Sequence, residues 1–424
     1  MFSRLLLVIA LLAGCQASPD KPDLPGDAVG TTDSGGHTAD GPTWHANVQP
    51  LLSTNCTRCH TEGGLGPGNF TDLNTVKALA PALLSAMEAG EMPPPASDPS
   101  CQDYEGSDHL NLSGDALDIF SAWVAADMPE GDRVTAPPPI QIKDQLDNPD
   151  AVVMMEAPYT PTFTDTENPG NEYRCFALDA GDLAGRSINA MAPILGNNQM
   201  VHHIVLFSLP TASLTDEMRD PRGWNCIDNA GVDSVNGMIS AWAPGMLPIE
   251  FPEGTGLAVD EDQSIVIQMH YFYNGAEDVP ESDQSGYAFH LAPEAEPVVP
   301  VFMAPIGDFS FVIPPGAPAY SSTDEFTNSY VPLKVLGIFP HMHELGSWFN
   351  ARVIHTDGTE TCLVDGAYSF DNQMTYQFKD AVPLNTGDSV EFTCTWDNSD
   401  GTEEVRWGER TNEEMCFFFS FVTL

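Results

Sequence analysis

The sequence predicts a multidomain chain in which a small all-α domain precedes two tandem all-β domains. Residues 44–133 include a candidate closing helix that starts at Ser113 as N-cap and places its apolar residues on one stripe, namely Leu117, Phe120, Trp123 and Val124. After about residue 150, short β-patterned runs alternate with Gly, Pro and Asn turns, which is typical of a sandwich or barrel. This β region is large for one sandwich, so we expect two, meeting near residues 292–305.

Composition sets the boundaries between these domains. Residues 16–43 are rich in Pro, Gly, Asp, Ser and Thr and cannot build a core, so they read as a flexible linker. Prolines 137–139 mark a second, semi-rigid linker. The clearest β runs are Ser264–Tyr273, Tyr287–Leu291 and Val331–Phe339. We therefore expect a signal peptide at 1–15, linkers at 16–43 and 134–149, the helical domain at 44–133, and β domains at 150–296 and 297–424.

The N-terminus predicts export. A short basic stretch ending at Arg4 precedes the apolar run Leu5–Leu12, which is too short for a membrane span and reads as a signal peptide. Residues 12–15 read LAGC and resemble the bacterial lipobox, which implies lipidation of Cys15; the alternative is an ordinary signal peptide that happens to carry a cysteine. Gln16 in place of an aspartate favours an outer-membrane anchor on the periplasmic or cell-surface face.

Charge and cysteine content limit the partners. The net charge is −46, with 15 Lys plus Arg, which excludes nucleic acid as a natural partner and disfavours anionic substrates. Nine cysteines in an exported chain indicate an oxidising compartment. Besides Cys15 and the two cysteines of the motif described next, an even number remains that suits disulfides: Cys101, Cys175, Cys226, Cys362, Cys394 and Cys416.

Residues 56–60 read CTRCH, the attachment motif of a c-type haem. Thiols of Cys56 and Cys59 would bind the haem covalently and His60 would be the proximal iron ligand. The alternatives are a chance match or a zinc or redox CxxC. Met92, in the proline-rich EMPPP loop, is the predicted sixth ligand, as in the cytochromes c that it resembles. The rival residues are Met87 and Met128, which suit a core, and His109, which suits the surface.

Five histidines and one methionine in the β region have the chemistry of copper ligands. Three imidazoles suit one copper ion, and a His-x-His pair on a strand points both rings to one face, where a thioether can complete a second site. The residues occur in the runs MVHHIVLF, VIQMHY, FPHMHELG and EEMC: His202, His203, His270, His341, His343 and Met415. Each element alone is a weak signal, whereas the combination and its order are specific.

This order resembles the copper type II, ascorbate-dependent monooxygenases, the family of peptidylglycine hydroxylase and dopamine β-monooxygenase, over about residues 150–424. The resemblance implies two β-jelly-rolls, each carrying one copper, with an open cleft between them. It assigns His202, His203 and His270 to an electron-transfer copper, and His341, His343 and Met415 to the catalytic, oxygen-binding copper. It also implies the disulfides Cys175–Cys226 and Cys394–Cys416; whether Cys101 and Cys362 pair or stay free remains open.

The implied reaction inserts one atom of O₂ into a C–H bond of a small-molecule substrate. Departures from the family pattern concern this substrate. The peptidylglycine enzymes hold the peptide carboxylate with an arginine two residues before the His-x-His pair, where this chain has Phe339. Polar residues after the EMC motif are replaced by Phe417, Phe418 and Phe419. An uncharged, apolar or aromatic substrate is therefore expected, and peptide amidation is not.

The predicted haem domain offers an internal one-electron donor for the two copper ions, at high effective concentration. A periplasmic redox protein or a small reductant would in turn reduce the haem. The main hypothesis is thus a haem-fed copper hydroxylase, anchored to a membrane through its lipid. The alternatives are an electron-transfer or copper-binding lipoprotein without hydroxylase activity, and a copper reductase with an acceptor other than oxygen.

Overall fold

The computed structural model describes residues 41–424 apart from 63, 65, 107–110, 134–144, 165, 167–168, 227–236, 274–280, 295–296, 371, 409 and 411. The predicted signal peptide, Cys15, most of the linker 16–43, His109 and most of the linker 134–149 lie outside the described residues. No helix in the described ranges is long and apolar enough to cross a membrane.

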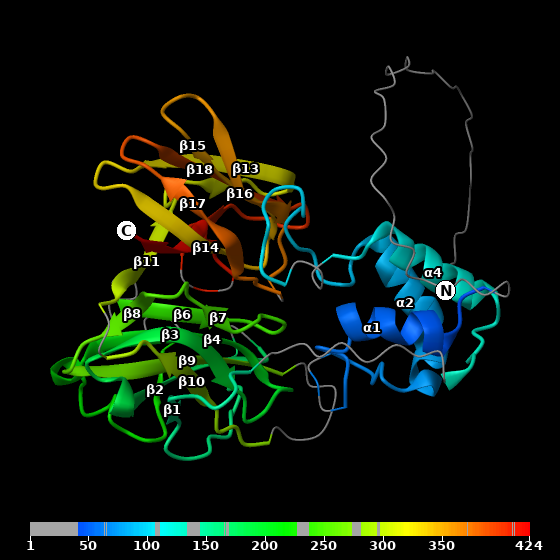
Figure 1. Cartoon of the computed structure of the whole chain (residues 1–424), viewed down its shortest axis with the longest axis horizontal. Coiled ribbons are helices and arrows are strands. Elements are labelled where there is room, and N and C mark those ends of the chain that lie inside the picture. Colours follow the sequence, from blue (N-terminus) through cyan, green and yellow to red (C-terminus); the bar gives the residue numbers. More distant parts are fainter. Residues whose placement is uncertain are drawn as a thin grey trace, which may run out of the picture. The chain divides into compact units, whose positions relative to one another are not determined.

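A short helical region comes first, and its helices pack around one small apolar cluster (Figure 1). The side chain of Asp72 caps α2 by accepting a hydrogen bond from the backbone N–H of Thr75, at 2.8 Å. The predicted stripe is confirmed in α4, where Phe120 and Trp123 are fully buried. The helices are η1 Trp44–Val48, α1 Gln49–Asn55, α2 Leu73–Ala89 and α4 Gly114–Ala125. A helical region is therefore confirmed, and its cytochrome c fold stays a prediction.

Two β-sandwich domains follow, as expected. The N-terminal sandwich has a five-stranded sheet, in the order β5-β2-β9-β4-β6, packed on the strands β1-β10-β3-β8, with β7 beside β3. Its strands are β1 Ala151–Met154, β2 Asn171–Asp179, β3 Arg186–Ile194, β4 Val201–Pro210, β5 Trp224–Asn225, β6 Met238–Trp242, β7 Ile249–Glu250, β8 Thr255–Val259, β9 Gln263–Phe272 and β10 Gly286–Leu291. Short 3₁₀ turns lie at Gly181–Leu183 and Thr211–Ser213.

The C-terminal sandwich packs the strands β11-β20-β14-β17 on a four-stranded sheet in the order β13-β18-β15-β16. A small pair, β12 with β19, lies beside them. The strands are β11 Val299–Gly307, β12 Val312–Ile313, β13 Ala317–Thr327, β14 Leu333–His341, β15 Gly346–Ile354, β16 Glu360–Ala367, β17 Tyr376–Leu384, β18 Ser389–Asn398, β19 Val405–Arg406 and β20 Phe417–Thr423.

One sheet runs through both sandwiches. Strands β8 and β11 pair in parallel, with Thr255 opposite Val299 and Leu257 opposite Val301, so the inner strands of both halves form a single nine-stranded sheet. The predicted meeting region, 292–305, contains the connection from β10 to β11 and the first part of β11. Backbone hydrogen bonds therefore join the two sandwiches, which limits how far one can move against the other.

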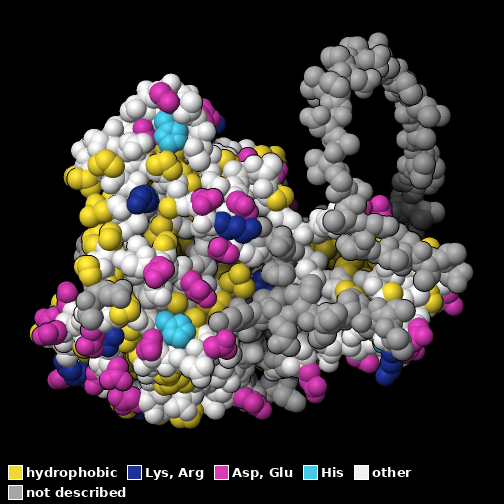
Figure 2. Space-filling view, in the orientation of Figure 1, with side chains coloured by type: hydrophobic (Ala, Val, Ile, Leu, Met, Phe, Trp, Pro, Cys, Tyr) yellow, Lys and Arg dark blue, Asp and Glu magenta, His cyan; other side chains and the backbone are white. Residues whose placement is uncertain are grey.

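Three disulfides hold the described chain together. Cys175–Cys226 and Cys394–Cys416 are the two pairs that the family resemblance implied. The third, Cys101–Cys362, answers the open question about these cysteines and links the segment after α2 to β16. Asp and Glu side chains are spread over the face seen in Figure 2, in keeping with the net charge of −46.

Candidate metal centres

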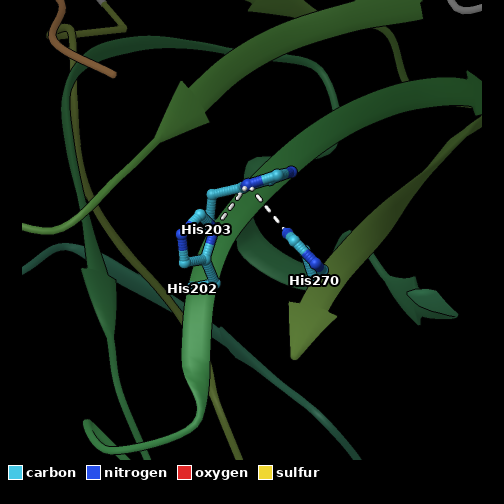
Figure 3. Close-up of side chains that lie close together, drawn as sticks. All are labelled: His202, His203 and His270. Carbon is cyan, nitrogen blue, oxygen red and sulfur yellow. Dashed lines mark hydrogen bonds between the residues drawn. The ribbon is translucent and has the colours of Figure 1, made fainter. Parts of the chain in front are cut away.

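The first candidate centre, here called the N-terminal cluster, consists of His202, His203 and His270 (Figure 3). Strands β4 and β9 are antiparallel neighbours, and His203 is paired directly with His270. Successive residues of a regular strand point to opposite faces, so His202 and His203 could not normally meet. The register shifts between Val201 and His203, and this irregularity brings both consecutive rings to the same cluster.

The ring nitrogens of this cluster converge on one point. The Nδ1 atom of His203 lies 3.3 Å from Nδ1 of His202 and 3.2 Å from Nδ1 of His270. Two nitrogens that bind one ion at about 2.0 Å in a tetrahedral arrangement lie about 3.3 Å apart, so both spacings suit a shared metal ion. Burial lowers the pKa of His203 and of His270 well below the ordinary value, which keeps both rings neutral and their lone pairs free.

A hydrogen bond fixes which nitrogen of His270 faces the cluster. Its Nε2 lies 2.6 Å from Oδ1 of Asn171, and because an amide oxygen only accepts, Nε2 carries the proton and Nδ1 keeps the lone pair. Tyr173 stacks on the His270 ring at a centroid distance of 4.2 Å and an angle of 5°. Asn171 and Tyr173, both on β2, therefore hold His270 in the orientation that a metal requires.

The second candidate centre, here called the C-terminal cluster, consists of His341, His343 and Met415. His341 ends β14, and His343 follows after the fully buried Met342. The two imidazole centroids lie 5.3 Å apart. Nδ1 of His341 donates to Oε1 of Gln373 at 2.7 Å, and Nδ1 of His343 donates to the Glu413 carbonyl at 3.1 Å. Both Nε2 atoms are thereby left with a free lone pair.

Glu414 ties Met415 to the histidine motif. Its carboxylate is fully buried and accepts hydrogen bonds from four N–H groups: the backbone amides of His343, Leu345 and Met415 and the indole of Trp396. Burial raises the pKa of Glu414 to about 7, while the N–H donors favour the ionised form. The next residue, Cys416, is joined to Cys394. This chain segment is thus anchored on both sides of Met415.

Both clusters line one cavity of about 220 Å³. His203 from the N-terminal cluster and all three members of the C-terminal cluster border it. The walls are mainly aromatic, and no Lys, Arg, Asp or Glu occurs among the described residues that line the cavity. The aromatic side chains are Tyr173, Phe207, Trp242, Phe309, Phe339, Phe370, Trp407, Phe417 and Phe419. Of the phenylalanines that the sequence analysis singled out, Phe339, Phe417 and Phe419 line this cavity, whereas Phe418 is buried in the core.

The CTRCH motif follows α1. Cys56 and Cys59 are partly buried and form no disulfide. Nδ1 of His60 donates to the Pro67 carbonyl at 2.8 Å, so Nε2 is free to bind a metal, and the ring stacks on Phe70 at 4.1 Å. A Cβ atom on Gly66 would lie 2.6 Å from the His60 ring, so the loop approaches the ring as closely as only glycine allows.

The three methionines considered as the sixth ligand differ in burial. Met92 lies in the loop after α2, and 39 % of it is exposed. Met87 is buried in the helical core and Met128 packs partly buried against it, as expected of core residues. Met92 as the iron ligand stays a prediction.

Sequence reasoning missed the residues that orient the ligands. Glu414 lies inside the EEMC run, so its position next to Met415 could have identified it as a residue that orients this ligand. Asn171, Gln373 and Phe370 had no such signal, because β2 and the loop after β16 reach the clusters only through tertiary folding. Gln268, two residues before His270 on β9, also lines the cavity, and its amide nitrogen lies 3.4 Å from the Cys226 carbonyl oxygen.

Comparison with known proteins agrees with this geometry. Profiles of the N-terminal and C-terminal domains of copper type II ascorbate-dependent monooxygenases match residues 163–277 and 306–421. Peptidyl-glycine alpha-amidating monooxygenase A of Xenopus laevis is 26% identical over 225 residues, covering 52% of this chain and 23% of that protein. Dopamine beta-hydroxylase of Canis lupus familiaris is 26% identical over 260 residues, covering 55% of this chain and 40% of that protein. The chain thus spans less than half the length of both relatives.

Proposed function

The chain belongs to the copper type II ascorbate-dependent monooxygenase family, and from this premise we propose that it hydroxylates a C–H bond of a small, uncharged, apolar or aromatic substrate. The overall reaction is RH + O₂ + 2 e⁻ + 2 H⁺ → ROH + H₂O. Bound copper would supply the one-electron redox chemistry and the activation of O₂. The N-terminal cluster would hold the electron-transfer copper, and the C-terminal cluster the catalytic one.

The observation that carries the proposal is the shared cavity. Ligand candidates from both clusters face one space, so a substrate bound there lies next to both. Aromatic walls without a charged side chain favour an apolar ligand, because a carboxylate would lose its hydration without gaining a partner. Phe339 is buried beside Phe419, with ring centroids 6.0 Å apart, at the place where the peptidylglycine enzymes carry their arginine.

The protein groups have defined tasks in this proposal. Asn171 and Gln373 hold His270 and His341 in the tautomers that leave a lone pair for the metal. The thioether of Met415 is a soft ligand, which favours the reduced ion at the C-terminal cluster. The aromatic walls exclude water, so that the reaction of O₂ is kept for the substrate.

We further propose that the electrons arrive through a c-type haem on Cys56 and Cys59, with His60 and Met92 as iron ligands. Free thiols, a free His60 Nε2 and a glycine loop against the ring fit such a group. An external redox protein or small reductant would reduce it. Export, lipidation at Cys15 and anchoring at the outer membrane belong to the same proposal and rest on the N-terminal sequence.

The test is incorporation of labelled oxygen from ¹⁸O₂ into candidate substrates, followed by mass spectrometry. With the full copper-loaded chain we expect labelled alcohols from small uncharged aromatic or aliphatic compounds, and none from glycine-extended peptides. Phe339→Arg is the matched variant, since a guanidinium should admit carboxylates and reduce turnover of apolar substrates. Faster turnover of the peptides by the unmodified chain would overturn the substrate class. Copper and haem uptake without any labelled product would favour a pure electron-transfer protein.

A further inference from the structure

One loop contacts both histidine clusters and lies near the CTRCH segment, the three parts of the molecule that the proposed function has to connect. It runs from Tyr368 to Gln373, between β16 and β17, and is here called the bridging loop. We infer that the bridging loop, with Phe370 as its central contact, is the path by which electrons pass from the CTRCH segment to the two histidine clusters. This inference rests on the proposed function and adds a route and a residue to it.

Phe370 contacts one histidine of each cluster. Its ring centroid lies 5.7 Å from the ring of His202, on β4, and 6.2 Å from the ring of His343, after β14. Among the aromatic contacts of the described residues, no other ring outside the clusters pairs with histidines of both. The ring also borders the cavity. Packed atoms therefore lead from one cluster to the other through a single side chain.

Hydrogen bonds fix the bridging loop against the C-terminal cluster. The hydroxyl of Tyr368 donates to the Met342 carbonyl at 2.6 Å and accepts from the Met342 amide at 3.0 Å. At the other end, Gln373 accepts from His341, and its own amide lies 3.2 Å from the Phe370 carbonyl. Phe370 is thus held between two anchors on the His-x-His motif, which restricts its position and its distance to both clusters.

The same loop comes near the CTRCH segment at Gly245. Arg58, the central residue of the motif, donates a hydrogen bond to the carbonyl of Gly245. A Cβ atom placed on Gly245 would lie 4.0 Å from Sγ of Cys59 and 3.7 Å from Oδ1 of Asn372. A side chain at position 245 would therefore meet both the haem-attachment motif and the bridging loop, which approach each other at this glycine. Residue 245 follows β6, which pairs with the histidine strand β4.

Covalent and backbone links hold the CTRCH-bearing region near this point. Segment 97–105 joins the C-terminal sandwich through the disulfide Cys101–Cys362 and through bridges of Ser97 with Gly366 and Tyr104 with Phe378. Tyr104 is buried there, and its hydroxyl donates to the Leu363 carbonyl at 3.0 Å. Such attachment suits a fixed electron path, whereas a freely swinging donor domain would need few contacts.

Each transfer along this path moves one electron and no proton. One ferrous iron becomes ferric, and one Cu(II) becomes Cu(I). Because the bridging loop contacts both clusters, a donor at this position can load each copper ion in turn. Two such transfers supply the two electrons of the overall reaction.

Flash photoreduction of the haem in the fully oxidised, copper-loaded chain tests the inference without substrate or oxygen. The absorbance of ferrous haem should decay in a fast phase, with matching loss of the Cu(II) electron paramagnetic resonance signal. Phe370→Ala should lose this fast phase because it replaces packed atoms with a gap, and Phe370→Leu should slow it. Phe370→Tyr should retain it, since the ring remains.

The matched control is Phe272→Ala. Phe272 also lies against the His202 ring, at 5.9 Å, but it is 40% exposed, and among the described residues its ring stacks on no ring of the bridging loop, so the fast phase should persist. Copper content is measured for every variant. Decay in Phe370→Ala at the rate of the unmodified chain, with both copper ions bound, would overturn the inference alone. An unmodified chain without covalent haem would overturn the haem part of the proposed function, and the inference with it.

Discussion

The N-terminal and C-terminal clusters border the same cavity, but they differ in which ring nitrogens are available to a metal. In the N-terminal cluster the three Nδ1 atoms converge, and Nε2 of His270 is held by Asn171. In the C-terminal cluster the Nδ1 atoms of His341 and His343 are held by protein oxygens, so Nε2 is the free atom. A histidine's role as a ligand is therefore set by the partner of its other nitrogen.

The two clusters also differ in what supports them. Paired strands with a register irregularity carry the N-terminal cluster, so backbone hydrogen bonds fix its three rings. The turn after β14 and a disulfide-bonded segment carry the C-terminal cluster and are tied together by buried Glu414, while the bridging loop holds His341 through Gln373. Three imidazoles suit a copper ion that changes charge repeatedly, whereas the thioether favours Cu(I). The different supports and ligand sets of the two clusters thus agree with different tasks for two copper ions at one cavity.

Removal of one ligand should have the largest effect on copper content and on hydroxylation. His203→Ala and His343→Ala should each lower the copper content from two ions to one, and each should abolish hydroxylation, because the proposed reaction needs both ions. Even residues that only orient a ligand typically contribute about 10–100-fold to activity or metal affinity, so loss of the ligand itself should exceed that. Mass spectrometry of bound metal and ¹⁸O incorporation measure the two effects. Unchanged copper content in both variants would contradict the assignment.

The two disulfides next to the clusters should have the next largest effect. In the chain-entropy description, removing Cys394–Cys416 should lower the free energy of unfolding by about 3 kcal/mol, and removing Cys175–Cys226 by about 4 kcal/mol, because the second closes a longer loop. Urea unfolding of the paired Cys→Ser variants measures both. Copper affinity should fall mainly in Cys394→Ser/Cys416→Ser, since Cys416 adjoins Met415. An equal loss of copper in the two variants would show that Cys394–Cys416 has no special role.

The sequence carried enough information for the β-sandwich architecture, and it singled out the candidate ligands, whose role as copper ligands stays a prediction. Short β-patterned runs between turn residues predicted β9, β10 and β14 within about two residues. These strands are buried on both faces over most of their length, so nearly continuous apolar runs of strand length mark them. Histidine motifs in a fixed order predicted that residues from four distant segments would meet. In the structure His203, His341, His343 and Met415 line one cavity, and His270 lies beside His203.

What the sequence could not show depends on tertiary contacts. The shared nine-stranded sheet arises from the parallel pairing of β8 with β11, and no local pattern specifies that pairing. Asn171, Gln373 and Phe370 are ordinary polar or apolar residues in the sequence, and only their position in space gives them a role. The pairing of Cys101 with Cys362, over 261 residues, is of the same kind. The positions of these two cysteines in the sequence did not decide whether they pair.

The smallest expected effects on copper binding come from Asn171 and Gln373, the residues that hold the histidine nitrogens that do not bind the metal. These effects also test most directly whether the two clusters use opposite ring nitrogens. Asn171→Ala should weaken copper binding only at the N-terminal cluster, and Gln373→Ala only at the C-terminal cluster, by about 10–100-fold each. Copper affinity should fall because the histidine ring, without its hydrogen-bond partner, can rotate or carry its proton on the nitrogen that would bind copper. Competition with a Cu(I) chelator measures affinity, and a background of His343→Ala or His203→Ala isolates the cluster under test.

Matched variants separate hydrogen bonding from packing in this experiment. Asn171→Asp and Gln373→Glu keep an oxygen acceptor of nearly the same size, and a carboxylate accepts from an imidazole N–H at least as well as an amide does. Affinity should therefore be retained in these two variants and lost in the alanine variants. Equal weakening by Asp and Ala at position 171 would show that the amide acts only by packing. If Asn171→Ala weakened copper binding at the C-terminal cluster, or Gln373→Ala at the N-terminal cluster, the two sites would not depend on separate orienting residues. The contrast between their ring nitrogens would then not explain how each site binds copper.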